Sequence, residues 1–452
     1  MTPRDYVQHS PTGVPTEEGV PAPRPSISVE KGDCVGIVCL TAGGPLSADQ
    51  VFDQLYRRYM DPALLYLPVG GFVRHGFARL MANLRQGHVA KQYEMIGGRS
   101  PLVPLSSEQA RDLRSRLQTR SACDGVDIRA YTAHRYGPNR FEDVARQMKA
   151  DDVDKVILLP MSAQYAQQRA ASWLRYWNVL VETGEISDWP RTAVHEFAAH
   201  PGYVQAISER IDEGMQRFSA AQRPDIHLLF TAEGQPLSDA DRQRDPSCCL
   251  TTATVEQVMR HRRETQPFSI AYQSPVGPSQ HAQPSVNEAV ARLGEAGTAA
   301  VLVVPVTFLT DRIETDVDLD INLREKAEMA GVEAFEVTRG LNSHPLLIDA
   351  LADAVLAQCR TRTSEPIVPT SLPGNERGDG STGIASSVSP QSLEPYHPAE
   401  LTMSTCPACQ QPRAHPMSWR FSDPATSLEP AIRPMIPADA LKPEALQVEE
   451  HA

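Results

Sequence analysis

The sequence predicts an α/β protein made of two doubly wound halves, each with a parallel sheet. Continuous apolar runs at 34–41 (CVGIVCLT), 154–161 and 299–309 are typical of strands that are buried on both faces. Amphipathic segments at 141–150 and 286–297 separate such runs and predict covering helices. A partial internal repeat supports the division into two halves.

The repeat consists of two pairs of similar segments. IVCLTAGGP (37–45) resembles LLFTAEGQP (228–236), and DKVILLPMSAQY (154–165) resembles AAVLVVPVTFLT (299–310). Each segment runs from a predicted strand into a loop. Ligands of such sheets bind beyond the carboxyl ends of the strands, so Glu233 is expected at the edge of a cleft between the halves.

Composition divides the 452 residues into a core with two extensions. Residues 1–30 are rich in Pro and Ser without periodicity and are predicted to be disordered. The core comprises a first half, 31–200, and a second half, 201–360. A Ser-, Pro- and Gly-rich linker follows at 361–400, and a Pro-rich tail with the sequence CPAC at 401–452.

The bulk properties exclude several classes of protein. The net charge of −13 and pI near 5.5 argue against a nucleic-acid binder. The sequence has no secretory h-region and no run of 18 apolar residues, so we expect a cytoplasmic protein without a membrane span. Peripheral membrane contact stays open. The eight scattered cysteines favour a reducing compartment.

Two acidic features are candidates for chemistry. Glu233 is a lone carboxylate in the turn after a buried strand. The segment FLTDRIETDVDLDIN (308–322) places Glu314, Asp318 and Asn322 at four-residue steps, on one face if the segment is helical. Such a row suits either a divalent cation or the solvated first turn of a helix, and these residues alone do not decide between them.

Eight segments in order give the core a resemblance to the ferrochelatases, enzymes that insert Fe²⁺ into a porphyrin to make haem. They fall in the family's order and spacing across roughly residues 33–360. The segments are LTAGGP (40–45), DPALLYLP (61–68), YEMIGGRSPLVPLSSEQA (93–110), HRYGPN (134–139), LLPMSAQY (158–165), FTAEGQP (230–236), YQSPVGPSQHAQP (272–284) and FLTDRIET (308–315).

The resemblance implies two Rossmann-like halves with a porphyrin between them and Fe²⁺ as substrate. Metal insertion removes two pyrrole protons, which requires a base and metal-binding carboxylates. Glu314 matches the family's catalytic glutamate, and Glu233 stands where the family has a histidine. Both are candidate catalytic residues, and Glu233, Glu314 and Asp318 are candidate metal ligands. Arg312 replaces another family histidine.

The resemblance also implies a set of porphyrin-binding residues. Arg169 is new at its position and suits either a porphyrin propionate or a plain surface role. Because several site motifs are altered, two alternatives stay open: insertion of Fe²⁺ into protoporphyrin IX or coproporphyrin III, or binding of porphyrin or haem without insertion. A relic with an empty cleft is a third. The porphyrin-binding candidates are Tyr136, Gln164, Tyr165, Arg169 and Ser274.

The cysteines near the end of the core suggest one further site. Some ferrochelatases carry a [2Fe–2S] cluster in this region, where Cys359, Cys406 and Cys409 lie. A C-x-x-C with His415 is an incomplete ligand set for zinc or a cluster. The sequence therefore favours a tail without a metal.

Overall fold

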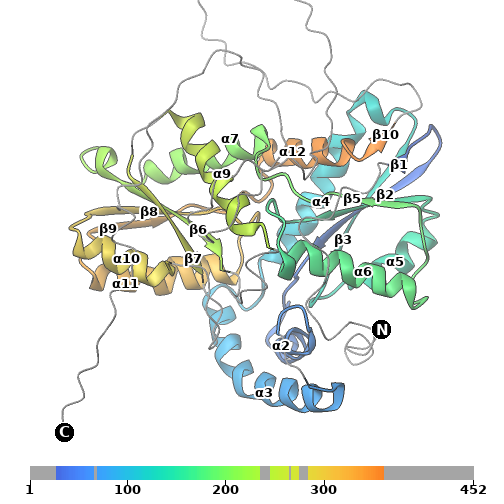
Figure 1. Cartoon of the computed structure of the whole chain (residues 1–452), viewed down its shortest axis with the longest axis horizontal. Coiled ribbons are helices and arrows are strands. Elements are labelled where there is room, and N and C mark those ends of the chain that lie inside the picture. The colour runs from blue at the N-terminus through green and yellow to red at the C-terminus, as the bar shows by residue number, and fades with distance from the viewer. Residues whose placement is uncertain (1–26, 66–68, 235–244, 264–265, 274–283, 361–452) are drawn as a thin grey trace, which may run out of the picture.

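The computed structural model describes residues 27–65, 69–234, 245–263, 266–273 and 284–360. They form two α/β halves that lie side by side (Figure 1). The linker, the CPAC tail and Ser274 lie outside the described residues. Within the predicted disordered segment 1–30, the expectation is wrong at its end, because strand β1 (Ile27–Ser28) pairs in parallel with β10 (Cys359–Arg360).

Both halves contain a four-stranded parallel sheet with the same spatial order, which confirms the predicted fold class. The order is β3-β2-β4-β5 in the first half and β7-β6-β8-β9 in the second. The strands are β2 (Cys34–Thr41), β3 (Asp127–His134), β4 (Lys155–Pro160), β5 (Arg191–Ala193), β6 (His227–Glu233), β7 (Phe268–Gln273), β8 (Ala300–Pro305) and β9 (Ala334–Val337).

The continuous apolar runs form the central strands because both faces of each sheet are covered. All eight residues of β2 and all six of β8 are buried. The strand expected at 299–309 ends earlier, at Pro305. Val306 and Leu309 are nevertheless buried, because they belong to the core that the two halves share instead of extending the sheet.

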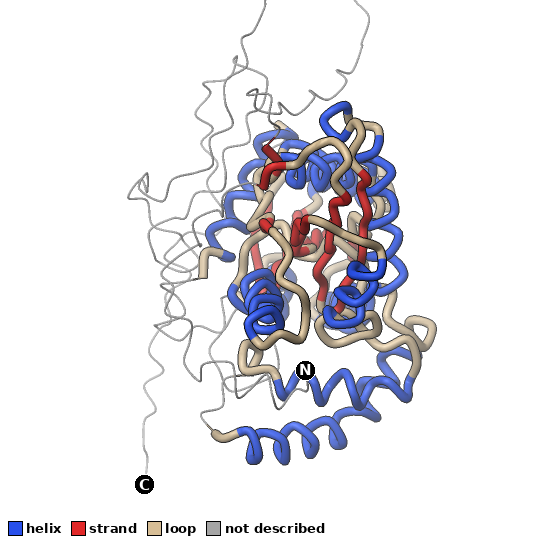
Figure 2. The backbone as a smooth tube through the Cα atoms, turned by 90° about the vertical axis from the view of Figure 1, so that its right-hand side faces the viewer, coloured by secondary structure: helices blue, strands red, loops and turns tan. Residues whose placement is uncertain are grey.

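Helices enclose the strands on both sides (Figure 2). The segment predicted at 141–150 is helix α5, and that at 286–297 is α10 with an end at Glu295. The helices are α2 (Val51–Met60), α3 (Gly71–Met95), α4 (Leu102–Gln118), α5 (Phe141–Ala150), α6 (Ser172–Glu182), α7 (Pro201–Met215), α9 (Ser247–Arg262), α10 (Val286–Glu295), α11 (Leu323–Met329) and α12 (Pro345–Leu356). Short 3₁₀ turns occupy Ala48–Gln50, Ser121–Cys123 and Arg223–Asp225.

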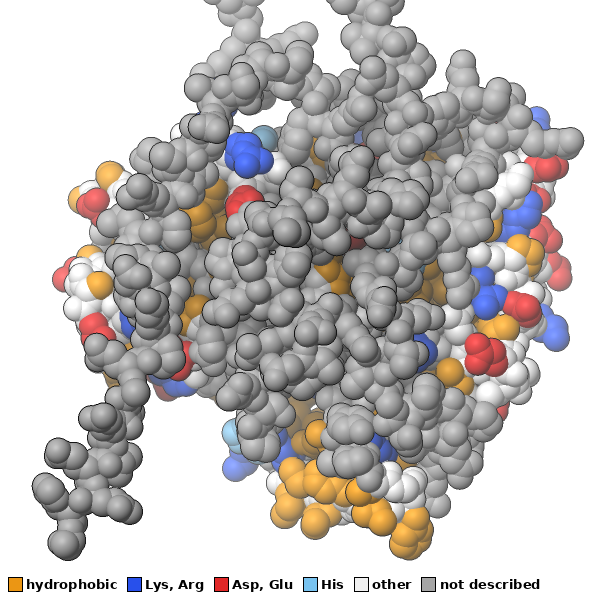
Figure 3. Space-filling model, in the orientation of Figure 1, with side chains coloured by type: hydrophobic (Ala, Val, Ile, Leu, Met, Phe, Trp, Pro, Cys, Tyr) orange, Lys and Arg blue, Asp and Glu red, His pale blue; other side chains and the backbone are white. Residues whose placement is uncertain are grey.

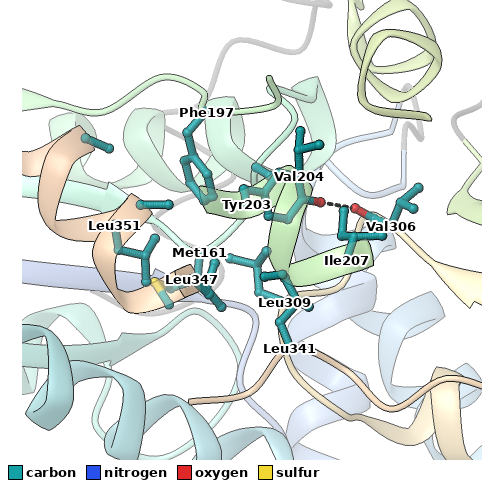
Figure 4. Packing of buried hydrophobic residues seen from close by; sticks show 14 of the residues in the cluster. Met161, Phe197, Tyr203, Val204, Ile207, Val306, Leu309, Leu341, Leu347 and Leu351 are labelled. Carbon is teal, nitrogen blue, oxygen red and sulfur yellow. Dashed lines mark hydrogen bonds between the residues drawn. The ribbon is translucent and has the colours of Figure 1, made fainter. Parts of the chain in front are cut away.

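One hydrophobic cluster runs through both halves and fixes them against each other. Figure 4 shows Phe197 and Tyr203 packed with Leu347 and Leu351 of α12. The Tyr203 hydroxyl donates a hydrogen bond to the Val306 carbonyl, which ties α7 to the end of β8. Because this shared core lies behind the strand ends, the loops of the two halves keep a fixed relative position.

No helix within the described ranges is long and apolar enough to cross a membrane.

Candidate active site at the strand ends of the two halves

Each half continues from its third strand into a π-helix, and these two π-helices carry the candidate site. In the first half η3 (Gln167–Ala171) follows β4 and leads into α6. In the second half η5 (Glu314–Asn322) follows β8 and leads into α11. Such turns are rare and frequently lie at functional sites. The acidic row at 314–322 is therefore helical, but with a wider turn than the α-helix that its four-residue steps suggested.

Glu314, the first residue of η5, is held by an arginine from its own loop. The Arg312 Nε lies 2.8 Å from Oε2 of Glu314, and the Arg312 guanidinium carbon lies 4.5 Å from the Phe308 ring centre. Burial alone would raise the pKa of the Glu314 carboxyl, but the charges of Arg312 and Arg58 outweigh burial and lower that pKa. Glu314 is therefore an ionised carboxylate at neutral pH.

Two further carboxyls of η5 have a raised pKa, in contrast to Glu314. Partial desolvation, and then the charge of Glu314, raise the pKa of Asp318 to about 6. Burial, and then the charge of Asp311, raise the pKa of Asp316 to about 6. Asp318 also accepts a hydrogen bond of 3.3 Å from the amide of Asn322. The row thus joins an ionised carboxylate to groups that gain and lose protons near neutrality.

Glu233, at the end of β6, is paired across the two halves. The Arg169 Nη1 of η3 lies 2.8 Å from Oε2 of Glu233, and the backbone N–H of Glu233 donates to the Thr307 hydroxyl. The Arg169 side chain is only 7% exposed, so Arg169 is no surface residue. Its Nε and Nη2 have no hydrogen-bond partner among the described residues. The pair crosslinks the halves, and these two guanidinium donors are buried without a hydrogen bond to any described residue.

The two acidic centres lie within electrostatic reach of one another. Burial lowers the pKa of Arg312, but the charges of Glu314 and then Glu233 raise it above its usual value. The Gln273 amide at the end of β7, beside Glu233 in the sheet, donates to the Glu314 carbonyl at 3.2 Å. Yet in the described ranges no three His, Cys, Asp or Glu side chains converge as metal ligands. The structure therefore brings Glu233 and Glu314 to one region without closing a metal site around them and Asp318.

The residues of this site belong to a sequence that matches one protein family along the whole core. The ferrochelatase family model matches residues 34–359. The chain belongs to the ferrochelatase family. It is 33% identical over 324 residues to the ferrochelatase of Gloeobacter violaceus, a match that covers 71% of this chain and 97% of that protein. Against the ferrochelatase of Parasynechococcus marenigrum it is 34% identical over 326 residues, covering 71% and 82%. Family membership assigns the chain to the metal chelatases, which are lyases.

Similarity to solved structures is weaker. SirB from Bacillus subtilis with Fe³⁺ matches with a TM-score of 0.38 and 11% identity, covering 56% of this chain and 90% of that one. DR2241 from Deinococcus radiodurans, described as similar to chelatases, matches with a TM-score of 0.36 and 12% identity, covering 72% and 55%. At these TM-scores neither match adds to the fold that the strands themselves define.

Three of the predicted porphyrin-binding residues of this ferrochelatase-family chain are buried in addition to Arg169. The Gln164 amide donates to the Thr254 hydroxyl at 3.0 Å and to the Val306 carbonyl at 3.3 Å. Tyr165 packs against His195, with ring centres 5.9 Å apart. The Tyr136 hydroxyl donates to Asp61 at 2.7 Å. These groups are engaged in the protein interior, and their contact with a porphyrin stays a prediction.

The α2–α3 region places residues near Glu314 that the sequence analysis did not single out. Arg58 of α2 adds positive charge near Glu314, and Tyr93 of α3 lies near enough for the charge of Glu314, after burial, to raise its pKa. Asp61, which follows α2, forms a buried ion pair of 2.8 Å with Arg135. Asp61 and Arg135 lie in the segments DPALLYLP and HRYGPN, which both belong to the family pattern. These two segments were the only indication in the sequence of this ion pair.

Cys359 is half-buried at the end of the core, and its predicted role in a metal site or cluster stays a prediction. It lies in β10, its thiol donates to the Val355 carbonyl at 3.6 Å, and burial raises its pKa to about 12. Cys406 and Cys409 lie outside the described residues.

Proposed function

We propose that this chain inserts Fe²⁺ into protoporphyrin IX or coproporphyrin III in cytoplasmic haem biosynthesis. Family membership supports metal insertion into a porphyrin in general terms. The observation that carries the finer proposal is the acidic row of η5, where an ionised Glu314 precedes Asp318, whose pKa is about 6. Metal insertion needs both a charged ligand for Fe²⁺ and a proton acceptor.

The two carboxyls divide this work according to their pKa values. Glu314 stays ionised and serves as the oxygen ligand that receives Fe²⁺ as the metal sheds water. Asp318, with a pKa of about 6, is matched to accept protons near neutral pH. An entering Fe²⁺ must displace the Arg312 guanidinium from Glu314, because that guanidinium occupies Oε2 at 2.8 Å.

Glu233 has a smaller part in this scheme. Its carboxylate is paired with the buried Arg169 guanidinium, so a metal or a proton must compete with a fixed cation for it. The unpaired Nε and Nη2 of Arg169 suit a carboxylate of the porphyrin, as planar guanidinium donors bind carboxylates well. We therefore assign Glu233 mainly to positioning Arg169.

A second candidate function is the binding of porphyrin or haem without metal insertion. It is favoured by one observation: both Glu314 and Glu233 are paired with an arginine, which repels a divalent cation. The two candidates differ in whether Fe²⁺ can displace Arg312.

The test mixes the full chain with porphyrin and Fe²⁺ under anaerobic conditions and follows the visible spectrum. Metalloporphyrin formation above a protein-free control is the expected result. A shifted Soret band without turnover would instead support binding alone. An unchanged spectrum would contradict both functions.

A further inference from the structure

The β8–η5 loop, residues 306–313, carries Arg312 and leads into Glu314, and it is held from two sides. On one side its Ile313 packs against the small apolar core between α2 and α3. Figure 3 shows these two helices as a lobe at the bottom of the molecule, where exposed apolar side chains gather. On the other side lies the β9–α12 loop, residues 338–344, whose contacts are polar and directional.

Asn342 of the β9–α12 loop binds both the backbone and the side chain of Asp311. The Asp311 N–H donates to Oδ1 of Asn342 at 2.9 Å, and Nδ2 of Asn342 donates to Oδ2 of Asp311 at 2.8 Å. The other carboxylate oxygen of Asp311 accepts the backbone N–H of Gly340 at 2.6 Å. A side chain at 340 would collide there, since a Cβ would lie 2.8 Å from that oxygen. Both carboxylate oxygens of Asp311 are thus bound by the β9–α12 loop.

The backbone of Asn342 is fixed as well. Its φ is +49°, a left-handed conformation in which Asn is one of the few common residue types besides Gly. Its N–H donates to the Leu309 carbonyl at 2.8 Å, and its carbonyl accepts from Nε2 of Gln109 at 2.7 Å. Gln109 is buried in α4 of the first half. Asn342 therefore joins α4 of the first half to the β8–η5 loop of the second.

Asp311 directly precedes Arg312, and the backbone of Arg312 begins the first turn of η5. The Arg312 N–H donates to the Thr315 hydroxyl at 2.8 Å, and its carbonyl accepts the Asp316 N–H at 2.9 Å. A displaced Asp311 therefore displaces this turn, and with it the Glu314 carboxylate. A reaction loses rate when a reacting group is misplaced by even about 1 Å, because these groups must be held in one geometry.

We propose that Asn342 is a positioning residue for metal insertion, which holds the Glu314 carboxylate in place through Asp311. This role rests on the proposed function, in which Glu314 receives Fe²⁺. Asn suits the position for two reasons. It adopts the left-handed conformation, and it offers both an acceptor for the Asp311 N–H and a donor for the Asp311 carboxylate.

Exchanging the two side chains tests the proposal in anaerobic Fe²⁺ insertion into protoporphyrin IX. N342D sets two carboxylates against each other, and D311N leaves one oxygen to accept two N–H groups. Each single change should therefore lower kcat/KM for Fe²⁺ by about tenfold, with KM for the porphyrin altered less than about twofold. D311N/N342D restores a complementary amide–carboxylate pair and should recover to within about threefold of the unaltered chain.

Two controls separate the amide from the backbone conformation and from a general charge effect. Glycine keeps the left-handed conformation without the amide, so N342G should lose about as much as N342D. D152N makes the same carboxylate-to-amide change as D311N at another left-handed residue. Asp152 precedes β4, at the end of the sheet opposite the site, so this change should leave insertion unaltered.

Hydrogen–deuterium exchange over residues 310–318 gives a readout without turnover. Exchange there should be faster in N342D and D311N and restored in the double variant, with β2 unchanged throughout. If the unaltered chain inserts no metal, the proposed function fails, and the exchange pattern still decides whether Asn342 fixes the loop. Unchanged exchange in both single variants would overturn the proposal. So would losses in kcat/KM that multiply in the double variant, because the two residues would then act independently.

Discussion

The two π-helices occupy equivalent places in the two halves but present opposite charges. Helix η3 after β4 carries the buried Arg169, whereas η5 after β8 carries Glu314, Asp316 and Asp318. Arg169 reaches across to Glu233 of the other half, while Glu314 pairs with Arg312 of its own loop. One half therefore supplies a fixed cation and the other a row of carboxylates.

The difference between the two ion pairs indicates which carboxylate can do chemistry. The Arg169 side chain is only 7% exposed. Separating it from Glu233 would therefore leave an uncompensated positive charge in the protein interior, which is energetically costly. The Arg312 side chain is 17% exposed and belongs to the same short loop as Glu314. Arg312 can therefore leave Glu314 at lower cost. This comparison indicates that Glu314 can exchange its arginine for a metal ion more easily than Glu233 can.

Removing Arg312 should have the largest effect on the Fe²⁺ concentration that the insertion reaction requires. R312A leaves Glu314 without its nearest competing cation, so the Fe²⁺ concentration for half-maximal insertion should fall by about tenfold. Initial rates at a series of Fe²⁺ concentrations measure this. The control is R292A, because Arg292 is an exposed arginine on α10. A half-maximal concentration that stays constant or rises would show that Arg312 does not compete with the metal.

The fold could be predicted from sequence more fully than the site. The apolar runs and the repeat predicted both parallel sheets, since a strand buried on two faces leaves a local signature that no distant residue changes. The sequence also singled out Glu233, Glu314 and the acidic row as candidates, and the structure places Glu233 and Glu314 in one region. The Arg169–Glu233 pair joins residues 64 positions apart. Such a pair depends on how the halves pack, as does the approach of Arg58 to Glu314, so spacing along the chain could not reveal either. The π-helical turns likewise leave no distinct residue pattern.

The pH dependence of insertion should separate two carboxyls of the same helix. Asp318 and Asp316 both have pKa values raised to about 6. If Asp318 accepts protons, activity is present above that pKa and is lost several-fold as the pH falls through about 6. D318N should lower the rate and remove this pH dependence, whereas D316N should keep both. Rates of both variants from about pH 5 to pH 8 decide the matter. An unaltered profile in D318N would exclude Asp318 as the acceptor.

The smallest effect is expected on stability, at the pair between the halves. R169M and E233Q should each lower the free energy of unfolding, and a double-mutant cycle should give a coupling of about 1 kcal/mol, because Glu233 is partly solvated. Urea unfolding of the four proteins measures it. The matched cycle R312M/E314Q should give a smaller coupling. A coupling near zero for Arg169 and Glu233 would mean that Glu233 is as free as Glu314.

The most direct test compares E314Q with E233Q in anaerobic Fe²⁺ insertion under identical conditions. Both changes remove one carboxylate and keep the side-chain shape. The division of roles predicts that E314Q loses at least about a hundredfold in initial rate, since it removes the metal-side carboxylate, while E233Q loses less than about tenfold. A larger loss in E233Q than in E314Q would contradict the account and assign the chemistry to the end of β6.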